Sequence, residues 1–308
     1  MGPETMTKQI EAQLEQIAGA DHVIQDAPMS KYTSFRAGGK ADLLVSVSSG
    51  ENLQQVLQFL AGEDIPHMIL GNGSNILVRD GGYRGVIVRI GEAFNRMRIE
   101  DHTLICGSGV SLAMAAKAAA NASLTGLEFA SGIPGSVGGG VFMNAGAYGG
   151  ELKDILKKAV LITGDGAAFA EAGPEELEMG YRHTRLHETG EIVVEAAFEL
   201  EPGDPKAILA LMADLTARRN EKQPVTYPSA GSFFKRPEGY FAGKLIQDAG
   251  LKGLSVGGAQ VSQLHSGFII NTGGATATDI LQLMQIVQAR VLDQFGVLLE
   301  PEVRIIGE

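Results

Sequence analysis

The chain has 308 residues, and its 41 glycines are about twice the usual share of a soluble protein. It has only 11 prolines and no Gly-X-Y repeat, so the composition excludes collagen and Pro/Gly low-complexity chains. A formal charge of −11 argues against nucleic acid as a general partner, and the single cysteine, Cys106, excludes an intramolecular disulfide.

Hydrophobic spacing predicts alternating helices and strands in the first ninety residues. Amphipathic helices are expected at residues 7–19 and at Asn52–Ala61. Short apolar runs predict strands at Ala41–Val47, His67–Leu70 and Gly85–Ile90. This order of elements is typical of a mixed α/β architecture.

The middle of the chain continues with a strand at Leu104–Cys106 and an alanine-rich helix at Leu112–Ala122. Further strands are expected at about 158–163 and 192–200. The segment Glu201–Pro205 combines glycine and proline, which indicates a boundary or linker.

Helical spacing returns in the last third of the chain. A long helix is expected at Pro205–Asn220, and Thr276 with Asp279 forms a capping box that opens another helix, which Gly296 ends. In the closing strand, Val303 and Ile305 share one face. Glu302 and Arg304 therefore take the other face.

Glycine loops are the main candidates for ligand contact. The sequence has no GxGxxG and no GxxxxGK[ST], which argues against a dinucleotide-binding Rossmann domain and a P-loop NTPase. Gly71–Asn75 and Gly107–Ser111 could present backbone N–H groups or a helix N-terminus to an anion. Each is equally explained as a tight turn.

Residues 131–150 are unusual because they contain eight glycines. Glycine there would let the backbone lie against a large flat ligand. A flexible loop is the alternative, but the interspersed Ile, Val, Phe and Met side chains must pack somewhere.

Seven motifs in order along nearly the whole chain resemble the UDP-N-acetylenolpyruvoylglucosamine reductase family. They are Tyr32–Gly39, Gly71–Asp80, Ser131–Glu151, Tyr181-Arg182, Ala230–Lys235, Gly257–Gln260 and Pro301–Arg304. The resemblance implies an α+β protein with an FAD-binding domain of the vanillyl-alcohol-oxidase type, built of two α/β subdomains, and a smaller C-terminal α+β substrate domain. The expected divisions are an N-terminal helix and lead-in at 1–30, the FAD-binding domain at 31–203 and the substrate-binding domain at 204–308.

The resemblance also implies an oxidoreductase with noncovalent FAD that uses NADPH as co-substrate. It would reduce UDP-N-acetylglucosamine enolpyruvate to UDP-N-acetylmuramate in peptidoglycan precursor synthesis. A soluble, cytoplasmic protein is expected, with no membrane contact and no obligate protein partner, because no run of 18 apolar residues and no apolar signal segment occur.

The resemblance assigns three catalytic residues. Ser232 would donate the proton, with Lys235 as a polarising neighbour, since an isolated serine is a poor acid. Arg182 would hold the substrate carboxylate and stabilise the enolate. Glu302 would assist the enolate and is therefore expected to have a raised pKa. Without the resemblance, these residues could be a turn-capping serine, a surface ion pair and a solvated strand residue.

The residues expected to bind FAD lie mostly in the glycine loops. They are Arg36, Gly71, Asn72, Gly73, Ser74, Asn75, Ser131, Gly132, Ile133, Pro134, Gly135, Ser136, Gly138, Asn144, Ala145, Gly146 and Val193. Lys235 and Arg236 are expected to contact the substrate.

Other polar residues have simpler interpretations. Arg218, Arg219 and Lys222 form either a solvated helix end or a contact for the UDP diphosphate. His183 and His187 are expected to be structural, since they do not form HExxH, and no metal site is expected. Cys106 is expected to be a small buried hydrophobe.

Two rival functions stay open. Another flavin oxidase or dehydrogenase on the same fold would explain the glycine loops but not the motifs around Ser232 and Glu302. In a non-catalytic nucleotide-binding protein, Arg182, Ser232 and Glu302 would be surface residues. Arg182 and Ser232 lie 50 positions apart, as in the shorter subtype of the family, which lacks a loop with a substrate-covering tyrosine.

Overall fold

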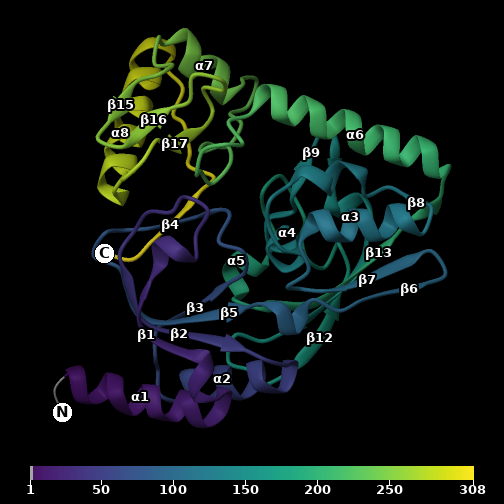
Figure 1. Cartoon of the computed structure of the whole chain (residues 1–308), viewed down its shortest axis with the longest axis vertical. Helices are drawn as coiled ribbons and strands as arrows, with labels where there is room; N and C mark the ends of the chain where they lie inside the picture. Colours follow the sequence, from purple (N-terminus) through teal and green to yellow (C-terminus); the bar gives the residue numbers. More distant parts are fainter. Residues whose placement is uncertain (1–2) are drawn as a thin grey trace. The chain divides into compact units, whose positions relative to one another are not determined.

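The computed structural model describes residues 3–308, with side chains from residue 7 onward, so residues 1 and 2 of the expected lead-in lie outside the described residues. The chain divides into two compact units whose segments alternate along the sequence (Figure 1). Unit 1 holds the residues up to Gln25, Leu43–Asn72 and Gly85–Arg218. Unit 2 holds Asp26–Asp42, Gly73–Arg84 and Arg219–Glu308.

A five-stranded antiparallel sheet, in the order β12-β11-β13-β7-β6, is the centre of unit 1. Its strands are β6 (Met97–Glu100), β7 (Thr103–Gly107), β11 (Leu156–Ile162), β12 (Phe169–Ala172) and β13 (Ile192–Glu199). The predicted strands at 104–106, 158–163 and 192–200 are confirmed as β7, β11 and β13. The sequence analysis did not predict the edge strands β6 and β12, which have four residues each and are mostly exposed.

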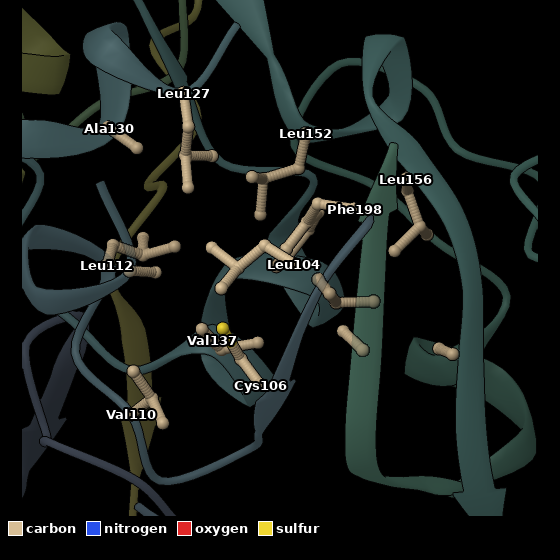
Figure 2. Packing of buried hydrophobic residues seen from close by; sticks show 14 of the residues in the cluster. Leu104, Cys106, Val110, Leu112, Leu127, Ala130, Val137, Leu152, Leu156 and Phe198 are labelled. Carbon is tan, nitrogen blue, oxygen red and sulfur yellow. The ribbon is translucent and has the colours of Figure 1, made fainter. Parts of the chain in front are cut away.

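Helices α3 (Leu112–Asn121) and α4 (Val137–Met143) pack on this sheet (Figure 1). Figure 2 shows the apolar core between these helices and the sheet, in which Val137 of α4 lies among strand residues such as Cys106 and Phe198. Helix α4 lies inside the glycine-rich segment, for which the sequence indicated a loop. The interspersed apolar residues Val137 and Val141 are buried, as expected.

The first elements of unit 1 follow the predicted pattern. Helices α1 (Pro3–Ala18) and α2 (Gly50–Gly62) are present, and Ser49 caps α2 by accepting the Asn52 N–H at 3.0 Å. The predicted strands are β2 (Lys40–Val47), β3 (His67–Leu70) and β5 (Tyr83–Ile90), which β1 (Val23–Pro28) precedes. Strands β3 and β5 pair in parallel.

Short elements complete unit 1. Strand β8 (Leu124–Thr125) pairs with β14 (Glu201–Pro202), and β9 (Gly146–Ala147) pairs with β10 (Gly150–Glu151). Helix α5 (Leu186–Thr189) precedes β13, and α6 (Pro205–Lys222) follows β14. The predicted boundary at 203/204 falls just before α6, whereas the change of unit falls inside α6, between Arg218 and Arg219.

Unit 2 contains a three-stranded antiparallel sheet, a parallel strand pair and two helices. The sheet is β15 (Ser255–Val256), β16 (Ala259–Val261) and β17 (Ile269–Asn271), and the pair is β4 (Ile76–Val78) with β18 (Arg304–Ile306). The helices are α7 (Ala242–Asp248) and α8 (Ala277–Phe295). The capping box of Thr276 and Asp279 is confirmed, as is the helix end at Gly296, which has φ +67°.

One apolar core joins the separate segments of unit 2. Phe35, Ala37 and Leu77 come from its two early segments and pack with residues of α7 and α8. Val303 is buried in this core and Ile305 packs against it, so the predicted shared face of the last strand is confirmed. The mixture of helices and strands in both units agrees with the predicted α+β class.

Candidate active site

The loop Gly71–Asn75 follows β3, and its first glycine lies against Ser136 of the glycine-rich segment 131–150. A Cβ at Gly71 would lie 2.5 Å from Ser136 Oγ, so the two loops are in contact within unit 1. Gly73 has φ +63°, and a Cβ there would collide with the Tyr32 carbonyl. Both positions therefore require glycine on steric grounds.

Asn75 belongs to unit 2 and contacts the strand of a predicted catalytic residue. Its Nδ2 donates to the Glu302 carbonyl at 3.1 Å, and its carbonyl accepts the Arg304 N–H at 3.0 Å. Asn75 thus fixes the backbone on both sides of Val303.

Helix α4 uses its own first-turn N–H groups within the protein. The N–H of Val137 donates to the Val110 carbonyl at 2.7 Å, and that of Gly138 to the Ser108 carbonyl at 2.9 Å. A Cβ on Gly138 would lie 2.9 Å from the Ser108 Cβ. Gly138 is therefore explained by its packing on the 107–109 loop. Ser136 caps the helix by accepting the Gly139 N–H at 3.4 Å.

Two buried hydroxyls beside α4 indicate a missing contact. Ser131 Oγ and Ser108 Oγ are buried, yet neither has a hydrogen-bond partner among the residues that the structure describes. Buried polar atoms are rarely left unpaired, so a bound molecule with polar groups would satisfy them. Gly139 adds to this indication, because it is exposed and a Cβ there would meet nothing closer than 3.5 Å. No steric contact therefore explains a residue that weakens the helix.

The other predicted cofactor residues have varied surroundings. Arg36 is exposed between buried Phe35 and Ala37, and its φ of +53° is in the left-handed region. Val193 is buried in β13, while Ile133 and Ala145 pack against the unit 1 core. The sequence marked the loop containing Ser108 but did not commit to this residue, whose unpaired hydroxyl is visible only in the structure.

Arg182 lies at the tip of a two-residue turn in unit 1. Mutual hydrogen bonds between Gly180 and His183, of 3.0 and 3.3 Å, close this turn. Arg182 has φ +52°, a left-handed conformation that is unfavourable for a side-chain-bearing residue. Its Nη2 donates to the Gly146 carbonyl at 3.1 Å, and its guanidinium lies 5.0 Å from the centre of the Tyr181 ring.

Ser232 and Glu302 lie on adjoining segments of unit 2. The Glu302 N–H donates to the Phe233 carbonyl at 2.8 Å, and the Lys235 N–H donates to the Glu300 carbonyl at 2.8 Å. Ser232 itself pairs with Phe268 on its other side. Phe233 is fully buried and contacts the Phe35 ring edge-on at 6.1 Å, so the apolar core anchors the segment that carries exposed Ser232.

The two predicted substrate contacts have partners of their own. Lys235 Nζ lies 3.7 Å from Glu300 Oε2. The Arg236 guanidinium lies 3.9 Å from the centre of the exposed Phe241 ring. Arg218 forms a 2.8 Å ion pair with Asp214 one helical turn earlier, which favours the interpretation of a solvated helix surface at that position.

The histidines and the cysteine have local partners. The His187 ring stacks on Phe142 at 4.1 Å, and its Nε2 lies 3.1 Å from the Phe142 carbonyl. No group of three His, Cys, Asp or Glu residues in the described part of the chain could hold a metal ion. Burial and the neighbouring Glu195 carboxylate raise the pKa of Cys106 to about 12, so its thiol stays protonated at neutral pH.

Comparison with known proteins places these features in a family. Residues 223–306 match the C-terminal domain of UDP-N-acetylenolpyruvoylglucosamine reductase, and residues 41–170 match an FAD binding domain. Among helices of residues 3–308, none is long and apolar enough to cross a membrane.

Curated relatives match over almost their full length. The UDP-N-acetylenolpyruvoylglucosamine reductase of Agathobacter rectalis is 49% identical and is matched over 99% of both chains. That of Clostridioides difficile is 48% identical over 95% of this chain and 96% of its own. A crystal structure of UDP-N-acetylenolpyruvylglucosamine reductase from Thermus caldophilus is 36% identical, with a TM-score of 0.79 over 92% of this chain and 98% of that one.

Proposed function

This chain belongs to the UDP-N-acetylenolpyruvoylglucosamine reductase family and is an FAD-dependent oxidoreductase, and from that premise we propose that it uses NADPH to reduce UDP-N-acetylglucosamine enolpyruvate to UDP-N-acetylmuramate. The reaction belongs to peptidoglycan precursor synthesis. The observation that carries the proposal is the backbone pairing of Glu302 with Phe233, which sets Ser232 and Glu302 on adjoining segments inside the matched C-terminal domain.

FAD, when bound, supplies the hydride that is added to the vinyl carbon of the substrate. We propose that it is held noncovalently by the loops around Gly71–Asn75 and residues 131–136, with Arg36 as a charged contact. The unpaired hydroxyl of Ser131 supports this assignment, because a polar group of the cofactor would give it the partner that the protein does not supply. Ser108 is added to the set on the same ground.

Arg182 has the task of stabilising negative charge. Hydride addition to the vinyl carbon moves an electron pair toward the adjacent carbon and its carboxylate, which gives an enolate. A guanidinium can hold both carboxylate oxygens and stabilise that charge as it develops. The surroundings of Arg182 support this role, because the Gly180–His183 bonds close its turn and the Gly146 carbonyl holds its guanidinium.

Ser232 and Glu302 complete the reaction on the carbon beside the carboxylate. Ser232 Oγ–H donates the proton to the enolate carbon. Glu302, together with Arg182, stabilises the enolate. Lys235 is close in sequence, but its ammonium group is shared with the Glu300 carboxylate at 3.7 Å. We propose that Lys235 and Arg236 contact the substrate, because they lie within four positions of Ser232.

An anaerobic flavin assay tests the proposal. FAD-loaded protein should bleach near 450 nm when NADPH is added and regain its colour when the enolpyruvyl sugar nucleotide follows. A protein that stays colourless after reconstitution with FAD would contradict the proposal. Bleaching by a small alcohol or hydroxy acid and rapid reoxidation by oxygen, with no response to the sugar nucleotide, would favour another flavin enzyme.

A further inference from the structure

The C-terminal end of α4 holds the segment that carries Arg182. The last carbonyls of a helix lack intrahelical donors and need partners from elsewhere. The Phe142 carbonyl receives Thr184 Oγ1 at 2.8 Å and lies 3.1 Å from His187 Nε2. Both partners follow the Arg182 turn in the chain, so this turn is anchored on its C-terminal side.

Asn144 anchors the other side of the turn. Its Nδ2 donates to the Gly180 carbonyl at 2.8 Å, and its Oδ1 accepts the Lys153 N–H at 3.0 Å. The side chain is fully buried, and its φ of +43° ends α4 in the left-handed region that asparagine tolerates. Both polar ends of Asn144 are thus engaged by the protein, although the sequence assigned this residue to the cofactor.

The Arg182 guanidinium is held by Gly146, two positions after Asn144. Arg182 Nη2 donates to the Gly146 carbonyl, so residues 144 and 146 hold the base of the turn and the head of the arginine respectively. A shift of about 1 Å in such a group costs on the order of a hundredfold in rate. Loss of the Asn144 hydrogen bonds should therefore displace Arg182 and so slow the reaction.

We propose that Asn144 is a positioning residue, which holds the Arg182 turn through its hydrogen bond to Gly180 and does not bind the cofactor. The catalytic consequence rests on the proposed function, because it needs Arg182 to act on the substrate. The anchoring itself does not, and it can be measured without turnover.

Two substitutions separate the hydrogen bond from the backbone conformation. Asn144→Gly keeps the left-handed backbone accessible but removes both side-chain bonds. Asn144→Asp keeps the acceptor for Lys153 but places a carboxylate oxygen against the Gly180 carbonyl. Asn52→Ala is the matched control, since Asn52 is also buried in unit 1, donates to the Ile17 carbonyl at 2.9 Å and accepts the Ser48 N–H at 3.1 Å.

Tryptic cleavage after Arg182, identified by mass spectrometry, reports on the anchor directly. We expect cleavage there about two- to tenfold faster in both Asn144 variants, because losing one hydrogen bond shifts the opening equilibrium by that factor. Cleavage after Arg98 and the FAD content should be unchanged. Unchanged cleavage after Arg182, or equal acceleration in Asn52→Ala, would overturn the proposal.

Flavin kinetics test the link to Arg182. In Asn144→Gly, flavin bleaching by NADPH should stay within about twofold, whereas reoxidation by the sugar nucleotide slows about ten- to a hundredfold. In an Arg182→Ala background, Asn144→Gly should add no further slowing. Additive slowing, or loss of FAD with normal cleavage after Arg182, would overturn the positioning role. If the unmodified protein never reoxidises with the sugar nucleotide, the proposed function fails, while the cleavage result still decides whether Asn144 anchors the turn.

Discussion

Three residues of the proposed site are held in the left-handed region although they are not glycine. Arg36, Asn144 and Arg182 have φ values of +53°, +43° and +52°. For residues with side chains this conformation costs about 1–2 kcal/mol, less for asparagine, and persists only where the surroundings enforce it. Six other non-glycine residues of the described chain share this conformation, so their neighbours, and not the φ value itself, distinguish these three residues.

At Ser232 the expected effect is confined to one half of the reaction. Ser232→Ala should bleach with NADPH at a normal rate but should reoxidise with the sugar nucleotide about a hundred- to ten-thousandfold more slowly, the usual range for a lost general acid. Stopped-flow absorbance near 450 nm measures both steps. Ser255→Ala removes an exposed serine of the same unit and should change neither step. Loss of both steps in Ser232→Ala would contradict the assigned role.

Among the elements, α4 is unusual because adjacent glycines in it have opposite surroundings. Gly138→Ala places a methyl group 2.9 Å from the Ser108 Cβ and should destabilise the protein by about 1–3 kcal/mol. Gly139→Ala meets nothing closer than 3.5 Å and should stabilise the flavin-free protein by about 0.5–1 kcal/mol, since alanine favours a helix. Urea unfolding followed by circular dichroism measures both. Equal effects would show that the packing on the 107–109 loop is wrong.

The N-terminus of α8, which Thr276 caps, has an additional acceptor in a distant segment. Asp80 accepts the N–H groups of Ala277 and Thr278, both at 2.8 Å, and the Thr278 hydroxyl at 2.6 Å. Partial burial disfavours the charged carboxylate, but the hydrogen bonds from Thr278 and Ala277 outweigh this effect and lower the pKa of Asp80 below its usual 3.8.

The hydrogen bonds to Asp80 predict how the free energy of unfolding depends on pH. Because the folded-state pKa of Asp80 lies below the unfolded value, its contribution is complete above about pH 4 and is lost as the pH falls through the folded value. Asp80→Asn should cost about 1 kcal/mol at pH 7, measured by urea unfolding, and less at pH 3. The control Asp293→Asn alters an exposed residue near the opposite end of α8 and should not destabilise the protein. A cost at Asp80 that is the same at both pH values would contradict this account.

At the scale of the whole molecule, the interleaving of the two units limits where the chain can be divided. A fragment of residues 204–308 lacks Phe35, Ala37 and Leu77 of the unit 2 core and also lacks β4, the partner of β18. We expect this fragment to be unfolded by circular dichroism and NMR dispersion. Co-expression with residues 1–203 should restore folded protein, and a folded fragment in isolation would contradict the role of these early segments.

Local signals in the sequence predict the regular elements well. Helix α2 follows from helical spacing, and α8 follows from helical spacing and the capping box at Thr276. Helix α4 could not be predicted, because three consecutive glycines oppose a helix and contacts with distant residues, such as the bonds to Val110 and Ser108, support it.

The residues of the candidate site come from the family resemblance and stay a prediction, and their geometry could not be predicted from the sequence. The resemblance identified Ser232 and Glu302, yet their proximity arises from pairing between segments that are far apart in the chain. The role we propose for Asn144 was not predictable either, because a buried asparagine that binds Gly180 has the same sequence signature as one that binds a cofactor.

The pairing of β4 with β18 has a consequence for biosynthesis. These strands are about 228 positions apart in the chain. Because ribosomes add on the order of 5–20 residues per second, β4 stays unpaired for roughly 11–46 s during synthesis. During that interval Phe35 and Leu77 lack most of the core that later covers them. The nascent chain therefore carries an apolar surface suited to chaperone binding until its last strand leaves the ribosome. A premature stop that removes only β18 would leave β4 without its strand partner.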